Sequence, residues 1–204
     1  MVSRLKRLIA DAVGHHGTPF MVFTVQHAEP QNGDPNSGLS QRGREQAGAF
    51  ASSMKRGDID VFISGPARAN VETVEAMHSA IGGEHVVLNE LNGSSGDVSE
   101  DDRRQKSDRL SHSRGGFDQA SADQFLAVLD LIRVQYAPTQ RVMVVTDGER
   151  TLNAVRTLRS DDEIEAEAPG TFEQGIPSCA MTTFVWNNGA WETETIAALT
   201  IPDI

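Results

Sequence analysis

The fold of this chain is decided by one stretch, Phe20-Met21-Val22-Phe23-Thr24-Val25, which runs directly into Gln26-His27-Ala28-Glu29-Pro30. Six consecutive residues that are almost all apolar or β-branched are typical of a strand buried on both faces of a sheet. Residues 28–38 then carry prolines and glycines at close intervals, which is the composition of a loop. The sequence therefore predicts a buried strand whose carboxyl end leads into a loop carrying a histidine.

Strand and helix patterns alternate along the rest of the chain. Further strands are expected at Asp60–Ser64, Val86–Leu88 and Val142–Thr146. Amphipathic helices are expected at Leu5–Val13, from the cap Ser40 to about Met54, at Ala67–Ala80, at Ala122–Tyr136 and at Thr151–Leu158. Two final strands, Met181–Trp186 and Trp191–Ile196, flank Asn187-Asn188-Gly189, a strong hairpin signal. This order predicts an α/β fold, namely a three-layer α/β/α sandwich with a mostly parallel sheet and an antiparallel pair at its end.

The length of 204 residues suits one domain spanning residues 1–204. Residues 92–120 are polar, rich in serine and glycine, and strongly charged, so we expect an insertion over one end of the sheet. The segment Asp161–Glu167 is expected to be an acidic surface segment.

Composition excludes several classes of function. The formal net charge of −11 argues against a nucleic-acid binder or a protein that binds anionic membranes. No stretch approaches the roughly 20 apolar residues that span a bilayer. The basic start of the chain is not followed by the apolar run of a signal peptide. A single cysteine, Cys179, allows no intramolecular disulfide, and we expect it to be buried packing in a cytoplasmic protein.

Ionisable residues follow each buried strand. His27 follows the first strand, Arg68 the second, Glu90 the third and Asp147 the fourth. Ligands of open α/β sheets bind beyond the carboxyl ends of the strands, so these side chains are expected to converge on one cleft. A histidine, an arginine and two carboxylates at one sheet edge would make an active site.

The residues at these strand ends resemble the motifs of a known family, the histidine phosphatase or phosphoglycerate mutase-like superfamily. Val25–Pro30 is similar to its R-H-G or R-H-A-E signature, and Leu39–Ala47 is similar to L-[ST]-x-x-G-x-x-Q-A. Val61–Thr73 resembles its strand followed by S-x-x-x-R-A-x-x-[TE]-T. Leu88–Leu91 matches L-x-E-L, and Val144–Gly148 stands at V-V-S-H-G. The five elements cover about residues 20–160 in the family's order.

The resemblance implies the phosphoglycerate mutase-like fold and a phosphohistidine mechanism. His27 would be the nucleophile, Arg68 a clamp on the phosphoryl oxygens and Glu90 the acid/base group. Arginine suits such a clamp because its planar fork matches phosphate oxygens.

Two positions depart from the pattern: Gln26 replaces an arginine, and Asp147 replaces the second histidine. A charge about 4 Å away is worth about 4 kcal/mol at an effective dielectric near 20, so these changes remove much of the stabilisation of an anionic transition state.

Three interpretations follow. In the first, the cleft is repurposed for other chemistry on a small organic molecule. His27 would be the central acid/base group there, with Asp147 beside it as its orienting carboxylate and Glu90 as a second acid. Gln26, Arg68 and Gly148 would contact the ligand. In the second, the protein is a non-catalytic pseudophosphatase that binds a ligand or a partner protein. In the third, it is a weak phosphomonoesterase in which an arginine of the insertion compensates: Arg103, Arg104, Arg109 or Arg114.

Other ligands receive less support from the sequence. A divalent metal held by His27, Glu90 and Asp147 is the least favoured alternative, because no H-x-x-H or H-x-D spacing accompanies these residues. No glycine-rich nucleotide loop is present, so no cofactor is expected. The terminal hairpin could offer an edge for a homodimer.

Overall fold

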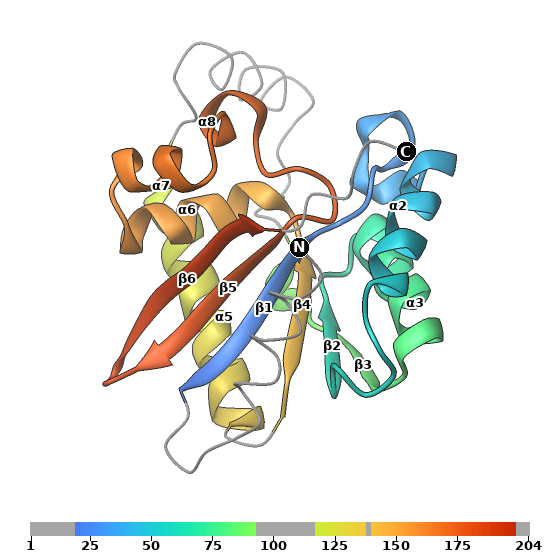
Figure 1. The fold of residues 1–204 in the computed structure, drawn as a ribbon, viewed down its shortest axis with the longest axis horizontal. Helices are drawn as coiled ribbons and strands as arrows, with labels where there is room; N and C mark the ends of the chain where they lie inside the picture. The colour runs from blue at the N-terminus through green and yellow to red at the C-terminus, as the bar shows by residue number, and fades with distance from the viewer. Residues whose placement is uncertain (1–18, 93–116, 138–139, 199–204) are drawn as a thin grey trace.

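A six-stranded sheet in the order β3-β2-β4-β1-β5-β6 forms the centre of the protein (Figure 1). The structure is a computed structural model that describes residues 19–92, 117–137 and 140–198. The strands are β1 (Phe20–Gln26), β2 (Val61–Ser64), β3 (Glu84–Val87), β4 (Val142–Thr146), β5 (Met181–Asn187) and β6 (Ala190–Ala198). The pairs β1–β4, β4–β2 and β2–β3 are parallel, whereas β1–β5 and β5–β6 are antiparallel. This arrangement confirms the predicted fold class.

Helices cover both faces of this sheet. The α-helices are α2 (Gln41–Ser52), α3 (Arg68–Ile81), α5 (Gln119–Tyr136), α6 (Gly148–Leu158), α7 (Asp161–Glu167) and α8 (Thr171–Gln174). Three short 3-10 turns are η1 (Gln31–Gly33), η2 (Pro35–Ser37) and η3 (Asn89–Leu91). The predicted helix at Leu5–Val13 and residues 93–116 of the predicted insertion lie outside the described residues.

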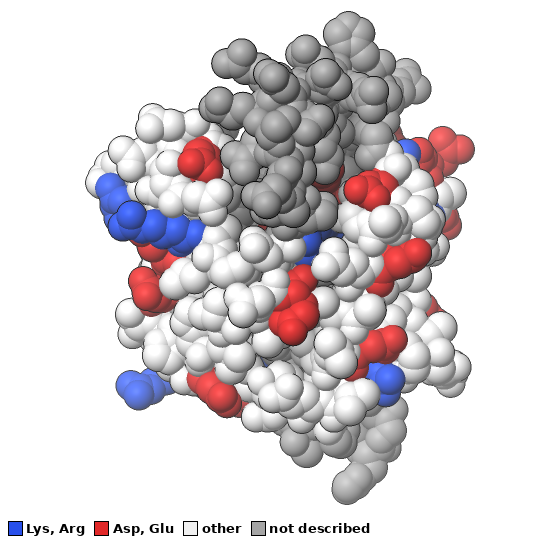
Figure 2. Space-filling model, turned by 180° about the vertical axis from the view of Figure 1, so that it is seen from behind, with Lys and Arg blue, Asp and Glu red and all other residues white. Residues whose placement is uncertain are grey.

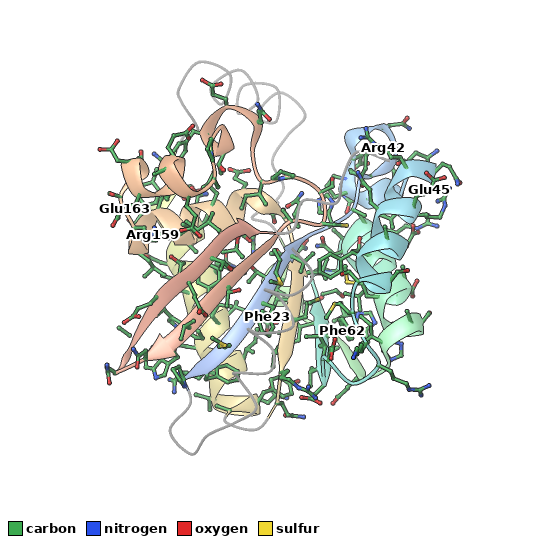
Figure 3. All side chains as sticks on the ribbon, viewed as in Figure 1. Phe23, Arg42, Glu45, Phe62, Arg159 and Glu163 are labelled. Carbon is green, nitrogen blue, oxygen red and sulfur yellow. The ribbon has the colours of Figure 1, made fainter. Side chains whose placement is uncertain are left out.

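Alternate residues of the central strands build two cores, one on each face of the sheet. Phe23 of β1 and Phe62 of β2 belong to the core that includes residues of α2 and α3. Val22 of β1 and Ile63 of β2 belong to the core that includes residues of α5 and α6. Figure 3 shows how densely side chains fill the space around the labelled Phe23 and Phe62. Burial on both faces explains why these strands are almost continuously apolar.

Helices α6 and α7 differ from the sequence prediction. Helix α6 begins at Gly148 rather than Thr151, because the Asp147 side chain accepts a hydrogen bond from the Arg150 N–H and caps the helix. The acidic segment Asp161–Glu167 is the helix α7, which starts with a reciprocal capping box between Ser160 and Glu163. Ile164 of α7 is fully buried, so this segment also contributes to the core.

None of the described helices is both long enough and apolar enough to cross a membrane. Figure 2 shows acidic side chains spread over the described part of the rear face, with basic side chains between them rather than gathered in one continuous patch.

Candidate functional site

The parallel strands β1, β2 and β4 end at the same edge of the sheet, and their following loops lie beside one another. The His27 N–H donates to the Thr146 carbonyl at 3.1 Å, and the Gly65 N–H donates to the Val145 carbonyl at 3.2 Å. The backbone therefore continues the parallel pairing past the last strand residues. This pairing brings the loops that carry His27 and Asp147 together, as the sequence predicted.

The imidazole of His27 is buried, with 5% of the residue exposed. Its Nδ1 lies 2.9 Å from the Ala28 carbonyl oxygen, which can only accept a hydrogen bond. Nδ1 must therefore carry a proton, and in the neutral ring Nε2 is left as the acceptor. The Gln26 Nε2 lies 3.5 Å from this atom. The ring is thus oriented by the main chain with Nε2 as its basic and nucleophilic atom.

The expected pairing of His27 with Asp147 is not formed, although their loops are adjacent. Among the described residues, the ring nitrogens of His27 contact only Gln26 and Ala28. The Asp147 Oδ1 accepts from the Arg150 N–H at 2.9 Å, and its Oδ2 lies 3.5 Å from the Arg150 Nε. The carboxylate turns to its own helix because α6 begins directly after it and offers both a free N–H and a cation.

Arg150 is a site residue that the sequence analysis missed. Its side chain is only 4% exposed, although it lies in the first turn of α6. Besides the contact with Asp147, it donates to the carbonyl of Glu90 at 3.3 Å and to the carbonyl of Asn92. The signal that could have found it is the spacing i, i+3 from the capping Asp147. Arg150 joins the start of α6 to the chain that follows β3.

Arg68, the expected anion clamp, is held by a carboxylate of its own helix. Its Nε donates to Glu72 Oε1 at 2.7 Å, and 67% of its side chain is exposed. Glu72 Oε2 in turn accepts from the Leu39 N–H at 2.8 Å. Donation by the Leu39 N–H, and then by Arg68, lowers the pKa of Glu72 below its usual value of 4.5. Glu72 is therefore ionised at neutral pH and neutralises Arg68.

Gln26 and Gly148 pack tightly against each other. A Cβ added at Gly148 would lie 2.7 Å from Gln26 Oε1 and 2.9 Å from the Ile176 Cβ, so only glycine fits there without a shift. The Gln26 Oε1 is buried and has no hydrogen-bond partner among the described residues. The close contact with the Gln26 side chain therefore explains why position 148 is a glycine.

Glu90 lies on η3 at the rim of this edge. Its backbone carbonyl is anchored by Arg150, whereas its side chain is exposed and forms no hydrogen bond or ion pair with any described residue. Within the described part of the chain, no three histidine, cysteine or acidic side chains come together to hold a metal ion. His27, Glu90 and Asp147 therefore do not form the metal site that was the least favoured alternative.

A protein-family model, that of the histidine phosphatase superfamily (branch 1), matches residues 15–198 of the sequence. The chain belongs to this superfamily. No curated protein matches the chain. This assignment confirms the resemblance drawn from the strand-end motifs.

Several solved structures share the fold over most of the chain. A phosphoserine phosphatase of Entamoeba histolytica, in complex with 3-phosphoglyceric acid, is 14% identical with a TM-score of 0.63, covering 88% of this chain and 98% of its own. A mycobacterial glucosyl-3-phosphoglycerate phosphatase is 15% identical with a TM-score of 0.63, covering 89% and 100%. A phosphoglycerate mutase of Bacillus anthracis is 14% identical with a TM-score of 0.61, covering 88% and 93%. At these identities the similarity shows the fold alone.

Proposed function

We propose that the cleft of this superfamily member acts on a small organic molecule that carries no phosphate, with His27 as its acid/base group. The observation that carries the proposal is that two arginines at the sheet edge are already paired with carboxylates. Arg68 is paired with Glu72, and Arg150 is paired with Asp147 and two carbonyls. Each cation is thus matched by a carboxylate before any ligand enters.

A phosphate dianion needs uncompensated positive charge or many N–H donors in its pocket. Gln26 supplies a neutral amide at the position where the family has an arginine, and Asp147 supplies a carboxylate where the family has a histidine. The charges at this edge therefore favour an uncharged or cationic ligand.

His27 keeps the geometry that acid/base work requires. The Ala28 carbonyl fixes the proton on Nδ1, so that Nε2 can take a proton from a bound molecule. In this proposal the exposed carboxyl of Glu90 is a second proton-transfer group at the rim. Asp147, held by Arg150, contacts the ligand through its partly exposed carboxylate, of which 34% is accessible, and Gln26, Arg68 and Gly148 complete the ligand-binding set.

The test compares two chromogenic esters on the same protein, p-nitrophenyl acetate and p-nitrophenyl phosphate. The first reports an imidazole that is open to an uncharged carbonyl compound, and the second reports phosphoryl transfer. We expect hydrolysis of the acetate that is lost in His27→Ala, and no hydrolysis of the phosphate above background. His78→Ala is the matched control, because His78 lies on α3 and its ring contacts the Gly83 carbonyl. Equal acetate hydrolysis in both variants would contradict the proposal.

A weak phosphomonoesterase is the second candidate, and one observation favours it. The tautomer of His27 that the Ala28 carbonyl selects leaves Nε2 unprotonated, and an unprotonated Nε2 can attack phosphorus as well as accept a proton. Phosphate-ester turnover that disappears in His27→Ala would support this candidate over the first. If neither ester is turned over in a manner that depends on His27, the remaining interpretation is favoured, namely a non-catalytic pseudophosphatase that binds a ligand or a partner protein.

A further inference from the structure

Glu72 is built into the structure more firmly than an ordinary surface carboxylate. Its Oε2 accepts from the Leu39 N–H at 2.8 Å, which joins α3 to the loop that follows His27. A Cβ at Gly38 would lie 2.6 Å from Glu72 Oε1, and Gly38 has a φ of +82°. Only glycine adopts this turn easily and leaves room for the carboxylate. The Leu39 N–H thus holds the carboxylate, and Gly38 leaves the space that it occupies.

The carboxylate held in this way contacts Arg68. The Arg68 Nε lies 2.7 Å from Glu72 Oε1, at the spacing i, i+4 of helix α3. The side chain of Glu72 is only 24% exposed, whereas that of Arg68 is 67% exposed. The Glu72 carboxylate is therefore the fixed member of the pair, and the position of the exposed Arg68 guanidinium depends on it.

We propose that Glu72 is a specificity-determining residue that keeps Arg68 from binding anions at the sheet edge. This inference rests on the proposed function, in which Arg68 and Arg150 at the sheet edge are each paired with a carboxylate. Glu72 acts through Arg68 and is a positioning residue rather than a catalytic one. Removing its charge returns a free guanidinium to the start of α3, directly after β2, and the site then accepts a phosphate dianion.

The experiment measures the binding of inorganic phosphate by calorimetry at about pH 8, where phosphate is a dianion. Glu72→Gln keeps an oxygen for the Leu39 N–H but removes the negative charge. We expect Glu72→Gln to bind phosphate about tenfold more tightly than the wild type, because the Arg68 side chain is 67% exposed and water screens the effect of the removed charge. The double variant Glu72→Gln with Arg68→Ala should lose this gain.

The matched control is Glu75→Gln, which removes the same charge one turn along α3. The Glu75 side chain is exposed and interacts electrostatically with His85 rather than with Arg68, so this variant should bind phosphate like the wild type. If Glu72→Gln does not fold, Glu72→Thr removes the same charge with a smaller side chain, and the same gain is expected.

Equal binding by Glu72→Gln and Glu75→Gln would overturn the inference, as would a gain that persists without Arg68. A different result would overturn the proposed function. That result is tight phosphate binding by the wild type that is lost in Arg68→Ala, because the unmodified cleft would then already have a free cation.

Discussion

Gly148 has no side chain, and this allows the first residue of α6 to pack closely against Gln26 at the end of β1. A Cβ there would lie 2.7 Å from Gln26 Oε1 and 2.9 Å from the Ile176 Cβ. We expect Gly148→Ala to lower the free energy of unfolding by about 1–3 kcal/mol, the usual cost of overpacking. Urea denaturation measures this change.

The control is Gly48→Ala, because Gly48 lies inside α2 with no atom within 4 Å of an added Cβ. That variant should gain about 0.5–1 kcal/mol from helix propensity. Equal effects of the two substitutions would show that position 148 is not tightly packed.

The buried guanidinium of Arg150 carries a second prediction at the scale of the residue. Arg150→Met leaves Asp147 without its cation and the carbonyls of Glu90 and Asn92 without their donor. We expect a loss of about 3 kcal/mol in the free energy of unfolding, measured by urea denaturation. Arg159→Met, which breaks the pair with Glu167 nearer the surface, should cost less than about 1 kcal/mol.

A double-mutant cycle with Asp147→Asn separates the ion pair from the other contacts of Arg150. We expect Arg150→Met to cost less in the Asp147→Asn background, because no charge is then left unpaired. A cost that is unchanged by Asp147→Asn would show that the pair contributes nothing.

The sequence predicted that the loops carrying His27 and Asp147 lie side by side at the sheet edge, but not how their side chains point. The positions of His27 and Asp147 follow from the ends of parallel strands, which pattern and topology define. The direction of the Asp147 carboxylate depends on where α6 begins, and its first turn has too few apolar residues to show a period. The direction of the Arg68 side chain is equally hidden in the sequence. Its guanidinium can bind either Glu72, at the spacing i, i+4, or a ligand, and the sequence does not name that ligand.

At the scale of elements, the start of β2 is tied to the start of β4 by one ion pair. Asp60 accepts from the Arg141 backbone N–H at 2.8 Å and from its guanidinium at 2.9 Å. These hydrogen bonds from Arg141 lower the pKa of Asp60 below its ordinary value of 3.8. The pair therefore stabilises the fold above about pH 3.8, and this contribution is lost as the pH falls through the lowered pKa.

We expect Asp60→Asn to lower the free energy of unfolding by about 1 kcal/mol at neutral pH. The difference from the wild type should shrink below pH 3.8. Urea unfolding between about pH 7 and pH 2.5 measures this dependence. Asp123→Asn, on the exposed face of α5, should show no such trend. A wild-type curve that runs parallel to that of Asp60→Asn would contradict the assignment.

The elements that the sequence predicted best are those with a complete apolar pattern. β1, β4 and the hairpin β5–β6 match within a residue or two, and Asn188 and Gly189 both have the positive φ that a two-residue hairpin turn needs. The sequence analysis did not predict helix α7, because Ile164 is its one buried residue. The seven residues of α7 are therefore mostly acidic and show no helical repeat of apolar residues. Its start signal, the capping box at Ser160, was present in the sequence.

At the scale of the whole molecule, the single cysteine reports on global unfolding. Cys179 is fully buried, and burial raises the pKa of its thiol to about 12. We expect no reaction of the native protein with 5,5′-dithiobis(2-nitrobenzoic acid) and complete reaction in urea, because only the thiolate attacks the reagent. If the native protein is labelled as rapidly as free glutathione, the segment around Cys179, just before β5, opens locally without global unfolding.

We propose that the sheet edge of this histidine phosphatase fold no longer offers the free positive charge that binds phosphate. Orthovanadate is the sharpest probe of this proposal, because it adopts the five-coordinate geometry of phosphoryl transfer. We expect calorimetric titration of the wild-type protein at about pH 8 to give no saturable heat at micromolar vanadate. Micromolar binding that disappears in Arg68→Ala would contradict it, because a working anion pocket would then exist at the sheet edge.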